Sequence, residues 1–256
     1  MKKLVELSFL FCMTILSFQE IYGQDWKSDS TWTNAKKNII RYNLSQPLLV
    51  GFNNAIIFGY ERMLKPNQSI SVNLGRMALP EIDDINSDEF EFTKSTGTGG
   101  YNFSVDYRFY LGKLNKFNGP RGVYIGPYFS SNHWKRDELW THERENGEMA
   151  EVTSNSSIKV QMAGFELGYQ FVFWDKMTLD LILIGPGIAY YDLSAQAKGN
   201  LTQEEKDELQ EILLEKIEEK FPGLDYTLDE GELDADGTLS TTSFGFRYLI
   251  HIGYTF

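Results

Sequence analysis

The last fourteen residues, SFGFRYLIHIGYTF (residues 243–256), alternate between two kinds of side chain. One set is wholly apolar or aromatic: Phe244, Phe246, Tyr248, Ile250, Ile252, Tyr254 and Phe256. The other set is mixed: Ser243, Gly245, Arg247, Leu249, His251, Gly253 and Thr255. Because successive side chains of a β-strand point to opposite faces, this period of two predicts a strand with one apolar face and one polar face.

Similar alternation recurs along the chain. It is clear over residues 101–112 and weaker in six further segments: 38–47, 54–64, 68–79, 121–134, 157–173 and 177–192. The pattern therefore predicts eight strands and an all-β fold. Within 157–173 the apolar residues change parity near Ala163, which predicts a β-bulge there, and Gly185-Pro186-Gly187 predicts a similar local bend.

The connections between these segments alternate in length. Short ones lie at residues 65–67, 174–176 and around Asn118-Gly119-Pro120, whereas long ones begin at Pro80, Lys135 and Leu193. Short turns at one end and long loops at the other are typical of a closed, up-and-down bacterial outer-membrane barrel, with the short turns and both termini on the periplasmic side. We expect residues 38–256 to form this barrel, with 193–242 as a long extracellular loop.

The polar faces decide between a membrane barrel and a soluble secreted, lipocalin-like binding barrel. They carry Arg41, Glu61, Asp106, Arg108, Glu166, Gln170, Asp180, Arg247 and His251, spaced by Gly59, Gly75, Gly164, Gly168, Gly245 and Gly253. The interior of an eight-stranded barrel is crowded, so frequent glycine favours a polar inside. The apolar faces are then expected to contact lipid, with Tyr and Phe in the interfacial girdles.

Composition excludes two other classes. The net charge of −12 argues against a nucleic-acid binder, whose affinity comes mostly from Lys and Arg. Past residue 18 there is no run of eighteen apolar residues, which excludes a bundle of transmembrane helices.

The N-terminus has the layout of a cleaved secretory signal peptide. Lys2 and Lys3 precede an apolar stretch from Leu7 to Phe18, and Gly23 is the expected cleavage site. We therefore expect residues 1–23 to be removed and residues 24–37 to form a periplasmic N-terminal segment. Cys12, the only cysteine, lies within the removed stretch behind bulky residues, so neither a lipid anchor nor a disulfide is expected.

Together these features resemble small outer-membrane β-barrels of Gram-negative bacteria, similar in layout to the OmpA-type transmembrane domain and to OmpX. The resemblance rests on the eight strands, the terminal Tyr254-Thr255-Phe256, and the segments 121–128 and 164–170. It implies insertion by the barrel-assembly machinery into the outer membrane, beside lipopolysaccharide, and it implies no reaction. No peptidoglycan-binding domain follows Phe256, so a cell-wall tether is not expected.

The charged interior predicts a plug of ion pairs, with Arg41 near Glu61 and Asp180 near His251. We expect these groups to satisfy one another and stabilise the barrel in preference to forming an ion channel or a proton pathway.

The predicted loops hold all the net negative charge. Residues 80–99, 132–156 and 193–242 carry −5, −3 and −10. Solvation explains this charge; divalent cations bridging loop carboxylates to lipopolysaccharide are the alternative.

In the last loop, a capping box at Thr202 and Glu205 and apolar residues at helical spacing predict a helix over about 203–221, with its apolar stripe covered by the barrel mouth or other loops. The acidic run Glu232, Asp234, Asp236 and Gly237 loosely fits a calcium loop, but Ser243 stands where its closing Glu belongs.

A lipid-A-modifying barrel enzyme, acting by acyl transfer or deacylation, is the rival class. A nucleophile and base for such an enzyme would have to come from Ser130, Ser131, His133 and His142. Ser156 and Lys159 match a Ser-x-x-Lys spacing without the rest of that motif set. We therefore expect a monomeric barrel with a structural, envelope-protective or surface-interaction role, an extracellular partner of unknown kind, and no catalytic, cofactor or metal site.

Overall fold

The computed structural model describes residues 36–78, 90–112, 114–115, 119–143, 148–199, 202–205, 209, 211 and 238–256. The predicted signal peptide, most of the segment 24–37 and most of the predicted loop helix lie outside these residues. The described strands are β1 (Asn38–Asn43), β2 (Ala55–Lys65), β3 (Gln68–Met77), β4 (Phe90–Tyr110), β5 (Gly122–Glu143), β6 (Met149–Phe173), β7 (Met177–Gly199) and β8 (Thr238–Thr255). A short helix, α3 (Ser45–Val50), follows β1.

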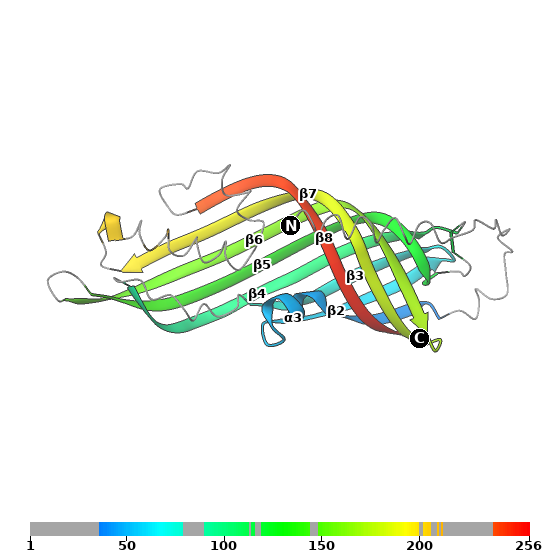
Figure 1. Cartoon of the computed structure of the whole chain (residues 1–256), viewed down its shortest axis with the longest axis horizontal. Coiled ribbons are helices and arrows are strands. Elements are labelled where there is room, and N and C mark those ends of the chain that lie inside the picture. The colour runs from blue at the N-terminus through cyan, green and yellow to red at the C-terminus, as the bar shows by residue number, and fades with distance from the viewer. Residues whose placement is uncertain are drawn as a thin grey trace, which may run out of the picture.

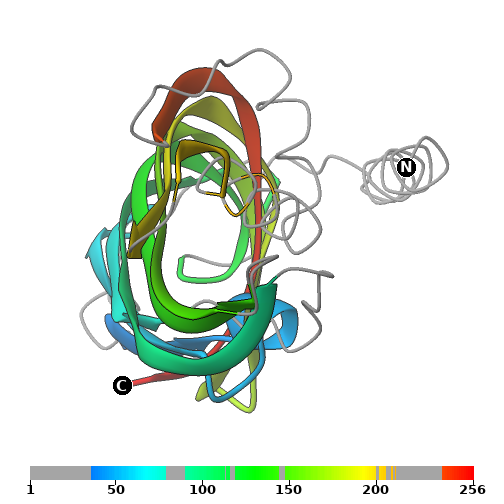
Figure 2. The same ribbon diagram turned by 90° about the vertical axis from the view of Figure 1, so that its left-hand side faces the viewer.

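The eight strands close into a ring. Each strand pairs antiparallel with the next in the chain, and β1 pairs with β8 through partners such as Ile39 with Thr255. The fold is therefore all-β, antiparallel and up-and-down, as predicted (Figure 1). Figure 2, in which the left-hand side of Figure 1 faces the viewer, shows the strands curving around the interior.

The strands differ greatly in length. β1, β2 and β3 have 6, 11 and 10 residues, whereas β4 to β7 have 21, 22, 25 and 23. The long strands run well past the first three at the end away from the short turns (Figure 1). Much of the three predicted loops is thus strand: residues 90–99, 135–143, 149–156, 193–199 and 238–242 extend the wall. The predicted loop boundaries were wrong there.

The two faces of each strand point as predicted. Phe246, Ile250 and Tyr254 are 54%, 38% and 46% exposed on the outside, whereas Glu166 and Arg247 are 2% and 7% exposed. β2 alternates strictly between buried and exposed residues over its first ten positions. The apolar side chains therefore cover the exterior and the charged ones fill the interior.

The bulge predicted near Ala163 was wrong. Ile158, Met162 and Glu166 are all buried, so the even-numbered residues of β6 point inward on both sides of Ala163. The pairing of Ala163 with Phe129 and Ile188 is regular. The apolar parity changes because the interior itself becomes apolar above the charged layer.

A real irregularity lies in β7, next to the predicted bend. Ile182 pairs with Leu249 on β8, but Gly185 pairs with Arg247, so one extra residue is inserted between them. This bulge changes which residues point inward, from Asp180 before it to Ala189 after it, both of which are buried.

The first strand ends earlier than predicted. It was expected to run to Pro47, yet residues 45–50 form α3. Pro47 has no N–H to donate to a sheet but fits the first turn of a helix. Gln46 N donates to Asn43 Oδ1 at 3.2 Å, and Gly51, with a φ of 92°, ends the helix by donating from its N–H to Pro47 O.

The interior is crowded around Gly59, as the glycines predicted. A Cβ on Gly59 would lie 2.1 Å from Asn73 Oδ1 and 2.8 Å from Arg41 Cγ. Glycine at this inward position therefore makes room for a neighbouring arginine.

Candidate functional site

A charged layer crosses the interior of the ring. Its eight charged or titratable side chains come from six strands, β1, β2, β4, β6, β7 and β8: Arg41, Glu61, Asp106, Arg108, Glu166, Asp180, Arg247 and His251. All of them are at most 7% exposed. We call this set the ionic layer.

Asp106 lies where the three arginines converge. Its carboxylate oxygens are 2.7 Å from Arg247 Nη2, 3.3 Å from Arg41 Nη2 and 3.8 Å from Arg108 Nη2. Ser71 Oγ donates a further hydrogen bond of 3.2 Å to Asp106 Oδ2. One carboxylate thus joins β1, β4 and β8 across the interior.

The two predicted ion pairs are both present. Arg41 Nη1 lies 3.5 Å from Glu61 Oε2, and His251 Nδ1 lies 3.3 Å from Asp180 Oδ2. Asp180 also lies 3.0 Å from Arg108 Nη2 and accepts a hydrogen bond of 2.7 Å from Tyr124 OH. The sequence therefore predicted correctly that these side chains lie close together.

Tyrosines cover the layer on the side of the short turns. Tyr110 OH donates to Glu61 Oε1 at 2.8 Å, and the Arg108 guanidinium lies 4.3 Å from the centre of the Tyr124 ring. Met63 packs with both tyrosines in a buried cluster. Charges removed from water need this degree of pairing to be tolerated, so these contacts fit the plug of ion pairs that the sequence predicts.

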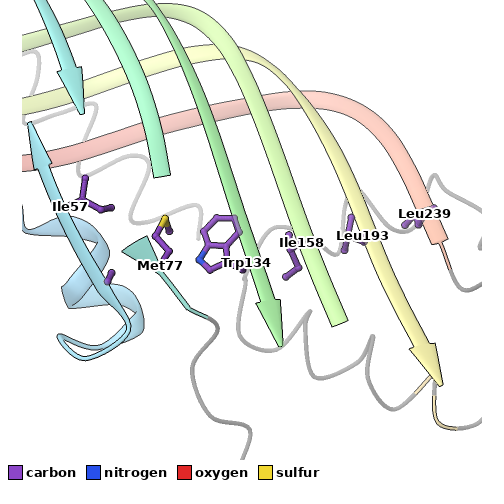
Figure 3. Packing of buried hydrophobic residues seen from close by; sticks show 7 residues of the cluster. Ile57, Met77, Trp134, Ile158, Leu193 and Leu239 are labelled. Atoms are coloured by element: carbon purple, nitrogen blue, oxygen red, sulfur yellow. The ribbon is translucent and has the colours of Figure 1, made fainter. Parts of the chain in front are cut away.

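An apolar cluster fills the ring on the other side of the ionic layer. Its buried members come from β2, β3 and β5 to β8: Ala55, Ile57, Met77, Trp134, Ile158, Leu193 and Leu239. Figure 3 shows these side chains contributed by successive strands. Along the barrel axis, the interior therefore contains first the ionic layer and then the apolar cluster.

The sequence did not reveal this apolar cluster. Ile158, Leu193 and Leu239 stand on inward positions that the pattern assigned to a bulge or to a loop. A detectable signal was present, because inward Ile158 and Leu193 alternate with outward Lys159 and Asp192, which reverses the earlier pattern.

Beyond the apolar cluster the long strands carry polar interior contacts. Arg136 Nε lies 2.8 Å from Glu138 Oε1, and Trp140 Nε1 donates to Ser154 Oγ at 2.8 Å. Burial raises the pKa of the Glu138 carboxyl, although the neighbouring Arg136 lowers it. Glu138 belongs to the acidic residues that the sequence placed in a loop; it lies inside the wall instead.

The outer surface is divided into an apolar belt and a polar collar. On β8 the outward residues are apolar from Phe256 to Phe244 and polar from Thr242 onward. On β7 the change falls between Tyr190 and Asp192, and Asp192 pairs with outward Lys159 of β6. We call the surface on the short-turn side of this border the apolar belt, and the surface beyond it the polar collar.

Among the described side chains, no serine–histidine hydrogen bond joins the predicted catalytic candidates. Ser130 points inward, whereas Ser131 and His133 lie on the opposite face of β5, two residues apart and thus about 6.6 Å along the strand. The centre of the His133 ring lies 5.5 Å from the centre of the Tyr101 ring. Ser156 and Lys159 also lie on opposite faces of β6, and the side chain of His142 lies outside the described residues.

The loop features are described only in part. Glu205 N donates to Thr202 Oγ1 at 3.3 Å and Thr202 N to Glu205 Oε2 at 2.6 Å, which confirms the capping box. Residues 203–205, 209 and 211 are helical, and Leu209 is fully buried. The calcium-like run 232–237 lies outside the described residues. Among those described, no three His, Cys, Asp or Glu side chains are grouped to hold a metal ion.

Comparison with protein-family models, curated proteins and solved structures finds no match to this chain. No helix within the described part of the chain is long and apolar enough to cross a bilayer.

Proposed function

We propose that this protein is an integral barrel of the outer membrane with a structural, envelope-protective or surface-interaction role. The observation that carries the proposal is the combination of an apolar belt outside with an ionic layer inside. A soluble barrel of the lipocalin kind would place its apolar faces inward and its charges toward water.

The height of the apolar belt fits a bilayer. From Phe244 to Phe256 the β8 strand takes twelve steps, which at about 3.3 Å per residue and a tilt of about 45° span roughly 28 Å. The hydrocarbon core of a bilayer is about 25–30 Å thick in such membranes. Aromatic residues such as Phe244, Tyr190 and Tyr254 lie near the two edges, where interfacial girdles are found.

The polar collar supports the surface role. In the proposed orientation β4 to β8 continue past the membrane on the cell exterior and carry the polar collar there. Solvated carboxylates there repel other anionic surfaces, which suits an envelope-protective or selective interaction role. The paired interior charges serve stability in this account, and no reaction is assigned to them.

The proposal is tested by refolding the chain without residues 1–23 into phosphatidylcholine vesicles. We expect resistance of the barrel to trypsin, retention in the vesicles after alkaline washing, and a gel mobility that changes only on boiling. Recovery of the folded protein in the supernatant, with no vesicle association, would contradict membrane insertion.

A further inference from the structure

The end of the ring that carries the short turns, where the C-terminus lies in Figure 1, is strongly basic. In the sequence, its four segments, 36–38, 62–68, 111–122 and 173–177, contain eight Lys or Arg side chains and one acidic side chain, Asp175. The three predicted loops of the other end are all acidic. We call the basic side chains that the structure describes at the short-turn end the basic rim: Lys36, Lys37, Arg62, Lys65, Arg121 and Lys176.

Strand pairing brings parts of the basic rim together. Asn38 of β1 pairs with Arg62 of β2, and Arg62 Nη1 donates to Asn38 Oδ1 at 2.5 Å. Lys36 Nζ donates to the backbone oxygen of Asp175 at 2.5 Å, in the turn that also contains Lys176. Both acceptors are uncharged amide oxygens. These contacts therefore hold the basic side chains in place without neutralising their charge.

Aromatic and apolar neighbours place the basic rim at the edge of the apolar belt. Arg62 is exposed on the outer face of β2 between Tyr60 and Leu64, which are 42% and 49% exposed. Trp174, two residues before Lys176, is 86% exposed. Trp and Tyr are enriched where a membrane meets water, and Lys and Arg extend their charged ends to the headgroups from such positions. In an inserted barrel, the basic rim therefore lies at the level of the lipid headgroups.

The charge of the basic rim selects among lipid headgroups. An anionic phospholipid offers phosphate oxygens that accept hydrogen bonds from Lys and Arg, and each basic residue near such a surface favours association by about fivefold. The ammonium group of phosphatidylcholine offsets this attraction. The net charge of the whole chain, −12, would by itself repel an anionic lipid. A preference for anionic lipid would therefore have to come from a local basic surface such as the rim.

We propose that the basic rim binds anionic phospholipids, such as phosphatidylglycerol, in the membrane leaflet on the short-turn side. The inference rests on the proposed function, because it requires an inserted barrel, and in that orientation the leaflet is the periplasmic one. The lysines and Arg62 bind the phosphate groups, while Tyr60 and Trp174 lie among the headgroups beside them. Lipid bound in this way fixes the depth of the barrel in the membrane.

The test compares two nitroxide-labelled lipids around protein refolded into phosphatidylcholine vesicles. Gel mobility before and after boiling first shows whether the barrel has inserted, so a failure of the proposed function is seen separately. Electron paramagnetic resonance then measures the fraction of each lipid that is immobilised beside the protein. At low salt we expect phosphatidylglycerol to associate about two- to fivefold more strongly than phosphatidylcholine. This preference should disappear in about 1 M salt, where the Debye length is about 3 Å. Equal association of both lipids with inserted protein at low salt would overturn the proposal and favour a soluble acidic partner for the rim.

Two double variants locate the lipid site. Lys65→Gln combined with Lys176→Gln removes two exposed lysines of the basic rim, and the preference for phosphatidylglycerol should fall by about half or more. Lys135→Gln combined with Lys159→Gln changes the net charge equally on the outer face of β5 and β6, beyond the border with the polar collar. This matched control should keep the preference of the wild type. An equal loss in both double variants, or an unchanged preference in the rim variant, would overturn the assignment to the rim.

Discussion

Asp106 on β4 accepts a hydrogen bond of 2.7 Å from Arg247 Nη2 on β8, although 141 residues separate the two in the chain. The two strands are not neighbours in the sheet, so this contact crosses the interior. The same carboxylate also binds Arg41 and Arg108. We therefore expect the stability of the ring to depend on this carboxylate, which is only 1% exposed.

Replacing Asp106 with Asn should destabilise the protein strongly. The change leaves three buried arginines with one carboxylate fewer, and breaking a buried ion pair by removing one partner costs about 3–5 kcal/mol. The measurement is the urea midpoint of unfolding from detergent or vesicles, followed by tryptophan fluorescence. Asp175→Asn, at an exposed turn position whose φ of 55° Asn tolerates, is the matched control and should leave the midpoint unchanged. Equal midpoints for both variants would show that the ionic layer does not stabilise the fold.

Adding one methyl group at Gly126 should also destabilise the ring. A Cβ at this inward position would lie 1.7 Å from the backbone oxygen of Tyr107 on the neighbouring strand, which cannot move as a side chain could. We expect Gly126→Ala to cost about 1–3 kcal/mol, the usual effect of overpacking. Gly99→Ala has no atom within 4 Å of the new Cβ and serves as the control. The urea midpoint of unfolding is measured for both variants. A loss of stability in Gly99→Ala as large as that in Gly126→Ala would refute the packing explanation.

A charge within the apolar belt should be far more costly than one on the polar collar. Ile250 faces outward near the middle of the belt, and Arg at a lipid-facing midplane position costs about 2–4 kcal/mol. Thr242, on the same face of β8 beyond the border, should accept Arg at a cost of about 0–1 kcal/mol. Folding yield and unfolding midpoint in vesicles compare the two variants. If Ile250→Arg is as harmless as Thr242→Arg, the belt does not contact lipid.

The filled interior predicts that the protein does not conduct. The ionic layer and the apolar cluster around Trp134 both lie across the ring. In a planar bilayer we expect no steady current steps from purified protein at either polarity. Reproducible steps of one size, absent from a mock preparation, would mean that the interior opens into a channel.

The strands, and the face on which each side chain lies, were predictable because apolar and polar residues alternate over most of the chain. Where the outside is apolar and the inside polar, as in 101–112 or 243–256, alternation alone assigns the inward residues, including Arg108 and Arg247. The Arg41–Glu61 and Asp180–His251 pairs followed from counting along those strands.

The long ends of the strands were missed for a physical reason. Beyond the border the outward residues become polar, as at Lys159 and Asp192, while the inward ones become apolar, as at Ile158 and Leu193. The sequence then shows the opposite alternation, which was interpreted as a bulge near Ala163 and as loops.

The central claim is that the outer face of β8 contacts lipid, and it is tested most directly by locating this face in a vesicle. The only cysteine of the chain is Cys12, so single cysteines introduced as Ile252→Cys and Ser240→Cys in protein lacking residues 1–23 can carry a nitroxide label. Collisions with oxygen, which concentrates in lipid, and with a water-soluble nickel chelate are then compared by electron paramagnetic resonance. We expect the label at 252 to collide with oxygen and to be shielded from nickel, and the label at 240 to collide with nickel. Equal access of nickel to both labels would contradict it.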